Sequence, residues 1–466
     1  MILFIVALSA FLGDFGSASG VACLNLQGVE WNMSPNAVNY SGNLNVAMLV
    51  VGGLLWIPPI YFWGRAPVIL WSTVLGTIFT LICVVTPSFQ VFHGFRALMG
   101  VTLTAGQTVG LAYIKDMFYF HEHARKIDLW ASLFLCSPFL APCLGNIMVG
   151  KLGAWRPVFW LVFALCCFDL LLILAFLDET WYRRDIATSE QPPRGTRLPR
   201  ATGIWQVRHR GYFMPVTQAI FRLFVVFLKP IMIPCMLYYA STFMWAVGIN
   251  ITGSILLQEP VALGGYGFGA VTIGLIYLSP VVSVGLGELF GHYFNDWNAA
   301  RYIARHGGVF RPEARLWANY VGGFLMTPGL VLLGQALQHR LTVGAVVMGK
   351  QSPSQWYKPR QHLNLLTFTL GWGMYMVGIM ISSVGITAYV LDAYPTSAGE
   401  VSALLNFARA FGGFTMGYFQ VARGETTGFG VNFGLQGMIV GMATISLTLI
   451  HIFGERLRKK GGALSF

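Results

Sequence analysis

Twelve apolar runs recur along the sequence, each about as long as the roughly 20 residues that cross a bilayer's hydrocarbon core. Lipid offers the backbone no hydrogen bonds, so only helices and closed barrels span it, and the alternating pattern of barrel strands is absent here. We therefore predict an all-α membrane protein with twelve transmembrane helices in two six-helix bundles. The expected helices are Ile2–Leu24, Leu44–Phe62, Pro67–Val85, Phe92–Tyr113, Leu129–Val149, Trp155–Leu177, Pro230–Ile251, Val271–Phe290, Leu316–Leu337, Leu363–Leu391, Val401–Val421 and Phe433–Ile452.

The composition argues against a soluble protein. Charged residues make up 10% of the chain, against about 25% in soluble domains. The net charge of +12 does not indicate nucleic-acid binding, because Lys and Arg gather in loops beside the apolar runs. The seven Cys and the loop His residues lack the spacing of metal ligands. Gly344–Gln351 resembles a phosphate-binding loop, but Gln351 stands where Ser or Thr must hold Mg²⁺. We expect no cofactor, no metal and no enzyme activity.

One polar stretch, at 182–211, separates the first six apolar runs from the last six. It contains seven Arg and three Pro, cannot bury a core, and is predicted to be a flexible linker. We assign residues 1–180 to an N-terminal bundle, 181–214 to a basic linker and 215–466 to a C-terminal bundle. Nineteen of the thirty Lys and Arg residues fall on the side of the linker and both termini, against seven on the other side. The positive-inside rule places that richer side in the cytoplasm.

Several motifs resemble one transporter family. The clearest are WGRAP at 63–67, RALMG at 96–100 with Lys115-Asp116 closing that helix, SPFLAPCLGN at 137–146, AYVLDAYP at 388–395 and NFAR at 406–409. Over nearly its whole length the sequence is similar to the major facilitator superfamily, specifically to its fungal twelve-span drug:proton antiporters. The resemblance implies the major facilitator fold, in which two bundles rock about a midplane cavity. Tyr61 departs from the pattern, since the wider superfamily has Asp there.

Three charged residues are the candidates for proton coupling. Asp14 is the only acid in the first expected helix, and a carboxyl group in an apolar span can exchange a proton near neutral pH. The alternative for Asp14 is a structural hydrogen bond to a neighbouring helix. Arg96 lies within the fourth helix, where a charge is costly unless it serves coupling or pairs within the bundle. Asp116 closes the motif of that helix.

Three further sets of residues follow from the resemblance. Small residues and prolines permit close contact and a bend in the fifth helix, although an ordinary kinked helix would look the same. Aromatic and polar residues of the seventh and eleventh helices are expected to line a substrate cavity, although such aromatics also pack against lipid or neighbours. The antiporter-type motif is Pro138, Pro142 and Gly145, the conformational loop is Gly64 and Arg65, and the cavity candidates are Tyr239, Trp245, Asn250, Asn406 and Arg409.

The resemblance implies a secondary transporter that exports a drug, toxin or secondary metabolite in exchange for protons. Two alternatives stay open: proton-coupled uptake of a nutrient or polyamine, and a sensor or scaffold that has lost transport. The expected partners are a small-molecule substrate, protons and the lipid bilayer, without nucleic acid. We expect a monomer in the plasma membrane with both termini in the cytoplasm.

Residues 350–371 interrupt the expected tenth helix with Lys350, Lys358 and Arg360. Each Lys or Arg near a helix centre costs about 2.5–3.5 kcal/mol in lipid. Removing this stretch would join Gly349 to Trp372 in a nearly unbroken apolar run, and codons for Gly349-Lys350 and Leu370-Gly371 permit splice sites. We therefore predict that 350–371 is a retained intron, which sequencing of the transcript would test. The alternative is a genuine outer loop that precedes a helix at Leu363–Leu391.

Overall fold

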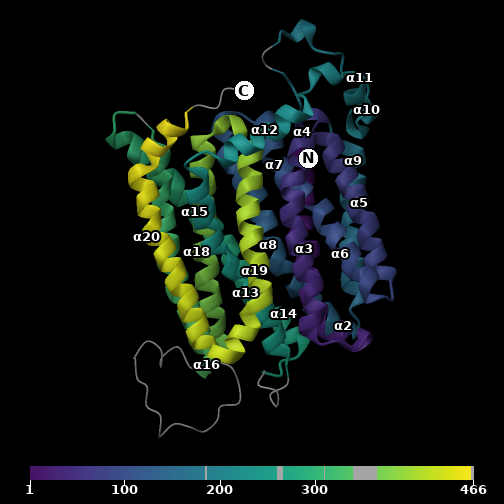
Figure 1. The fold of residues 1–466 in the computed structure, drawn as a ribbon, viewed down its shortest axis with the longest axis vertical. Coiled ribbons are helices and arrows are strands. Elements are labelled where there is room, and N and C mark those ends of the chain that lie inside the picture. The colour runs from purple at the N-terminus through teal and green to yellow at the C-terminus, as the bar shows by residue number, and fades with distance from the viewer. Residues whose placement is uncertain (184–185, 260–265, 309, 340–364, 463–466) are drawn as a thin grey trace.

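A computed structural model describes residues 1–183, 186–259, 266–308, 310–339 and 365–462, and within these ranges it contains helices and no strands. Figure 1 shows the long helices running side by side along one direction, with the first half of the chain on one side and the second half on the other. The helices of the first half are α1 (Ile2–Ser19), α2 (Leu24–Trp31), α3 (Pro35–Leu55), α4 (Ile57–Phe62), α5 (Arg65–Val85), α6 (Phe89–Leu103), α7 (Ala105–Met117), α8 (Phe120–Leu152) and α9 (Arg156–Phe176).

The second half repeats this arrangement after three short helices. Two of them, α10 (Arg197–Thr202) and α11 (Ile204–Arg208), are the linker helices, and α12 (Val216–Phe227) lies just beyond the predicted linker. The remaining helices are α13 (Met232–Gln258), α14 (Ala270–Ile276), α15 (Leu278–Arg305), α16 (Trp317–His339), α18 (Leu365–Ala393), α19 (Ala398–Thr427) and α20 (Phe429–Gly461).

In the described residues, eleven helical segments are long and apolar enough to cross a membrane, and each coincides with a predicted span. The remaining predicted span, the eleventh, corresponds to α19, a helix of 30 residues. Its buried face carries Asn406, Arg409 and Gln420, which lower its hydropathy. The polarity follows from its position, because α19 packs against α3 and α7 of the other half as well as α13 of its own.

The amino terminus, the linker helices and the carboxyl end of α20 lie at one end of the bundle (Figure 1). We call this the linker end, and the other the far end. Span four is divided at Thr104 into α6 and α7, so that α7 forms its linker-end half.

Part of the linker is folded rather than flexible, which corrects the sequence-based expectation. Arg200 forms an ion pair of 2.7 Å with Asp178 at the end of the first half. The Trp71 indole donates a hydrogen bond of 3.0 Å to the Thr202 carbonyl, and Trp205 is buried. These contacts hold α10 and α11 against the N-terminal bundle. Arginine content alone suggested a solvated chain, but here the Arg side chain has a carboxylate partner.

The predicted intron at 350–371 lies for the most part outside the described residues. Its last seven residues, from Leu365 to Gly371, form the first turns of α18. Within them Phe368 is fully buried, and its ring meets the Trp372 ring edge-on with centroids 5.7 Å apart. The span that the structure describes is therefore close to the alternative, Leu363–Leu391. The intron itself stays a prediction.

Candidate functional site

A cavity of about 760 Å³ lies between the two halves, in the linker-end part of the bundle. Its walls come from α7 and α8 of the first half and from α13, α18 and α19 of the second. Tyr119 and Asp392 mark its mouth at the ends of helices, and Tyr119 is 76% exposed. Arg409 lies at the other end of the cavity. Bulky rings make up much of the wall: Phe118, Tyr119, Trp130, Phe134 and Tyr239.

A buried ion pair joins the two halves at the inner end of this cavity. Nη1 of Arg409 donates to the Asp14 carboxylate at 2.7 Å, and both residues are 5% exposed. Nε and Nη2 of Arg409 donate to Oδ1 of Asn406 at 3.1 and 2.7 Å. The guanidinium also reaches Gln107 of α7 at 3.4 Å. The ion pair and these hydrogen bonds offset the free-energy cost of placing the Arg409 charge within a membrane span.

Arg409 also separates the large cavity from a second, smaller pocket. That pocket has a volume of about 80 Å³ and is lined by Asp14, Pro138, Asn250 and Arg409, among others. Arg409 is the residue that lines both spaces. Asp14 faces only the smaller one. A change in the Asp14–Arg409 pair therefore alters the lining of the large cavity and of the smaller pocket at the same time.

Arg96 of α6 contacts α1 just after Asp14, where it forms hydrogen bonds to the backbone of α1. Its Nη1 and Nη2 each donate at 2.8 Å to the carbonyls of Gly16 and Ser17. The guanidinium carbon stands 5.2 Å from the centroid of the Phe159 ring. These carbonyls come just before α1 tightens into a 3-10 turn at Gly20–Cys23. Arg96 thus supports the segment of α1 that carries Asp14, and its hydrogen-bond partners are carbonyls rather than a carboxylate.

The prolines of α8 provide a contact between the halves. Pro142 has no N–H, so the Pro138 carbonyl lacks its usual helical donor. Nδ2 of Asn250, on α13, donates to that carbonyl at 3.0 Å. Tyr277 donates in turn to Oδ1 of Asn250 at 2.5 Å. Gly145 permits a close approach within the first half, since a Cβ there would lie 2.9 Å from the Cβ of Ala22.

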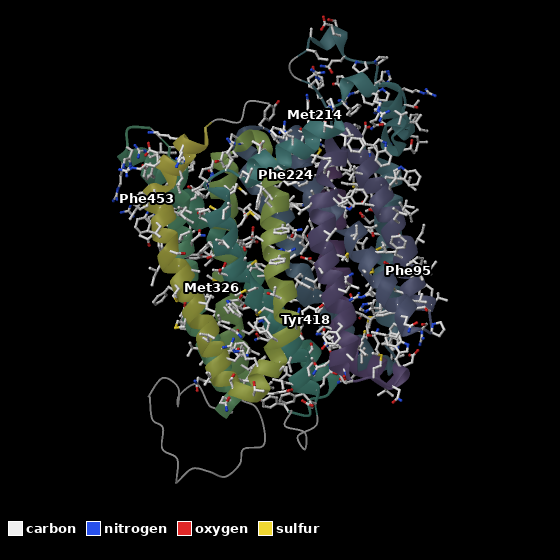
Figure 2. The ribbon with its side chains drawn as sticks, viewed as in Figure 1. Phe95, Met214, Phe224, Met326, Tyr418 and Phe453 are labelled. Atoms are coloured by element: carbon white, nitrogen blue, oxygen red, sulfur yellow. The ribbon has the colours of Figure 1, made fainter. Side chains whose placement is uncertain are left out.

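The halves also meet closely at the far end. Asn146, where the family resemblance leads us to expect Gly, accepts a hydrogen bond of 2.9 Å from Gln258 of α13, and Gln258 accepts one of 2.6 Å from Asn25. The rings of Tyr40 on α3 and Tyr418 on α19 stack at 5.7 Å. Tyr418 lies at this boundary in Figure 2. Direct contacts therefore join the far end, whereas the cavity lies toward the linker end.

The conformational loop gathers its charges at the linker end of the first half. Arg65 forms an ion pair with Asp116, and Thr180 donates to Asp116 at 3.0 Å. Oε2 of Glu179 accepts from the backbone N–H groups of Arg65 and Ala66 at 2.9 and 3.1 Å, and so caps the amino terminus of α5. Burial raises the pKa of the Glu179 carboxyl, although the Trp181 N–H, the Arg65 charge and the Ala66 N–H favour its charged form.

Gly64 permits this cap in two ways. Its φ of +91° lies in the region that glycine favours. A Cβ there would also stand 2.4 Å from the Glu179 carboxylate. Any larger residue would therefore both strain the backbone and displace Glu179.

Tyr61 takes part in a different linker-end contact, which we call the linker-end latch and define as Tyr61, Arg222 and Glu400. Arg222 of α12 pairs with Glu400 of α19 at 2.8 Å. The guanidinium carbon of Arg222 lies 4.8 Å from the centroid of the Tyr61 ring. The Met214 N–H donates at 3.2 Å to the Tyr61 carbonyl. The latch therefore ties the end of span two to the start of span eleven through α12.

The predicted site residues thus form separate groups. Asp14, Asn406 and Arg409 are in direct contact, and Tyr239 lines the large cavity with the last two. Asp116 belongs to the linker-end loop. Trp245 lies in the apolar core of the second half and lines neither of the two pockets described here. Sequence reasoning did not single out the following partners: Gln107, Glu179, Arg222, Tyr277 and Glu400.

Comparisons with known proteins agree with this arrangement. The family model described as Major Facilitator Superfamily matches residues 3–417. The chain belongs to the major facilitator superfamily. Among curated proteins, it is 24% identical over 436 residues to "Efflux pump radE" of Floropilus chiversii, covering 91% of this chain and 74% of that protein. It is 25% identical over 422 residues to "MFS-type transporter hepF" of Aspergillus oryzae, covering 88% and 79%.

Solved structures show the same fold. The proton:xylose symporter XylE superimposes with a TM-score of 0.65 at 14% identity, covering 97% of this chain and 95% of that one. A partially occluded inward-open form of XylE from E. coli gives a TM-score of 0.61 at 15% identity. The predicted family and fold are therefore confirmed. This superfamily member is a multi-pass membrane transporter and not an enzyme.

Proposed function

We propose that this transporter exports a small organic compound in exchange for protons. The observation that carries the proposal is the buried Asp14–Arg409 pair, which joins the two halves and bounds both spaces between them. The charge count favours a cytoplasmic linker end, and with that orientation the cavity of about 760 Å³ faces the cytoplasm. The name of the relative from Floropilus chiversii, an efflux pump, is consistent with export.

The pair suggests how protons drive the cycle. With Asp14 ionised, Arg409 holds the two halves together and the large cavity accepts a compound from the cytoplasm. After the bundles rock, Asp14 faces outward through the space that the smaller pocket now marks, and can take up a proton. Protonation removes the charge that holds Arg409, which allows the return. Release of the proton inside restores the pair.

The cavity disfavours the polyamine alternative. A polyamine needs unpaired carboxylates, and Asp392, the one carboxylate among the described lining residues, accepts a hydrogen bond of 2.5 Å from Arg315. Uptake of an uncharged nutrient remains distinguishable from export by the sign of coupling. A scaffold that has lost transport would show no flux at all.

The test uses a compound to which cells gain resistance when they overexpress the chain. The purified protein is placed in liposomes with an imposed pH gradient. An exchanger accumulates the compound inside when the lumen is acidic, because protons leave as the compound enters. A symporter accumulates it when the outside is acidic. Asp14→Asn should abolish accumulation with either direction of the pH gradient, but it should leave exchange of labelled for unlabelled compound. Accumulation by Asp14→Asn at the wild-type level would contradict the proposal.

A further inference from the structure

The charged side chains around the cavity are bound to one another. Arg409 pairs with Asp14 at 2.7 Å, and Arg315 pairs with Asp392 at 2.5 Å. Lys115, the other charged residue of the described lining, is half-buried and also has an interaction partner. Neither pair offers a free anion to a cationic compound. A charged compound would have to break one of these pairs.

The wall between these pairs is aromatic, with a few uncharged polar groups. Trp130, Phe134 and Tyr239 present rings at the inner part, and the Asn406 amide and the Ser383 and Thr387 hydroxyls also line the space. Rings of this kind stack on a flat aromatic compound, and the amide and hydroxyls can bond its oxygen atoms. Resting on the proton exchange proposed above, we propose that the exported compound is an uncharged aromatic molecule bearing hydroxyl or carbonyl groups.

The exchange of compound for protons, rather than their joint transport, indicates the same class of compound. Protonation of Asp14 leaves the Arg409 guanidinium without its counter-charge, so it requires either an anion or water. A carboxylate compound would supply the anion and would bind together with the proton, which produces symport. An uncharged aromatic ring would instead exclude the water, so it binds better when Asp14 is ionised. Compound and proton then exclude each other, as exchange demands.

Binding to the purified full chain tests the class directly. Three naphthyl probes share one ring and one linker, and end in a hydroxyl, a quaternary ammonium or a carboxylate. Calorimetric titration at neutral pH should show the hydroxyl probe binding at least about tenfold more tightly than either charged probe. The charged end of such a probe would find no free opposite charge, because the charged groups of the cavity are already paired. Lowering the pH should weaken binding of the hydroxyl probe, and Asp14→Asn should remove that pH dependence.

Thr387→Phe tests whether the probe binds in this cavity, because Thr387 lines the cavity and the larger Phe side chain would occupy part of its volume. It should abolish binding of the hydroxyl probe, and binding that persists would overturn the assignment to this cavity. Equally tight binding of the ammonium or carboxylate probe to the wild-type chain would overturn the substrate class. Flux in liposomes separates the two proposals. If the hydroxyl probe binds but moves no protons, exchange fails and the class stands; if a charged probe is exchanged for protons, the class fails and exchange stands.

Discussion

The Asp14 carboxylate accepts a hydrogen bond of 2.7 Å from Nη1 of Arg409, a residue 395 positions later in the chain. The two side chains come from α1 and α19, which belong to different halves of the transporter. Both are buried, so each depends on the other for compensation of its charge. The hydrogen bond from Asn250 to the Pro138 carbonyl is a second contact in which one half of the molecule supplies what the other lacks.

Removing either member of this pair should destabilise the protein by about 3–5 kcal/mol, because the other charge is left buried and alone. Asp14→Asn and Arg409→Gln should each lower the thermal unfolding midpoint in detergent. The double variant should recover most of that loss, yet show no proton-driven accumulation. A double variant that still concentrates substrate would assign proton coupling to another group.

Arg96→Ala should abolish gradient-driven transport and lower stability, because the carbonyls of Gly16 and Ser17 lose their side-chain donors. Each unsatisfied carbonyl costs about 1–3 kcal/mol. Arg96→Lys is the informative comparison, since an ammonium group cannot reproduce the fork that reaches both carbonyls. Transport by Arg96→Lys at the wild-type rate would show that the positive charge is sufficient without the fork.

Asn250→Leu should favour opening at the far end, since it leaves the Pro138 carbonyl without a donor in the present conformation. The expected shift is about 1–3 kcal/mol. Distances between spin labels on α8 and α14 should report a larger open population. Tyr277→Phe is the control, because it removes a donor to Asn250 but leaves the amide facing Pro138. A distance distribution unchanged in Asn250→Leu would refute a role for this bond in closure.

Arg222→Ala should destabilise the linker-end latch, because Glu400 is fully buried and would lose its counter-charge. The expected cost is about 3–5 kcal/mol, and adding Glu400→Gln should recover much of it. Thermal unfolding of the single and double variants measures both effects. If the double variant is no more stable than Arg222→Ala, then Arg222 acts through the Tyr61 ring rather than through Glu400.

Cysteine labelling tests the orientation of the chain in the membrane. In a background without Cys136 and Cys167, the half-buried native thiols, a membrane-impermeant maleimide applied to intact cells should label Ser34→Cys at the far end. Gly195→Cys in the linker should react only after the cells are permeabilised, as the positive-inside rule predicts. The reverse pattern would place the linker end outside and invert the proposed direction of transport.

The helical fold was predictable because span length and hydropathy depend on local sequence. Pairings were harder, as Arg409 illustrates. The sequence indicated it as a cavity residue, and Asp14 as a buried acid, but nothing local says that they meet across 395 positions. Glu179 was not singled out from the sequence, because its role as the cap of α5 depends on how the loop at Gly64 folds.

α12 was missed for a different reason. It spans only twelve residues and mixes Arg222 with apolar residues, so no window of membrane-spanning length contains it. Its apolar residues Phe221 and Phe224 are exposed, and Phe224 lies at the linker end in Figure 2. The Arg222–Glu400 pair gives the helix its place. A search of short windows for one apolar face at helical spacing would have found it.

The polarity of α19 has a consequence for how the protein is made. An Arg at the centre of a helix costs about 2.5–3.5 kcal/mol on insertion, and α19 alone among the predicted spans falls short of the hydropathy of a membrane helix in the described chain. Its counter-ion, Asp14, is synthesised almost 400 residues earlier. We therefore expect the first half to enter the membrane before α19 is synthesised and to supply the counter-charge of Arg409. A chain translated without α1 would lack that carboxylate, and we expect its α19 to insert less efficiently.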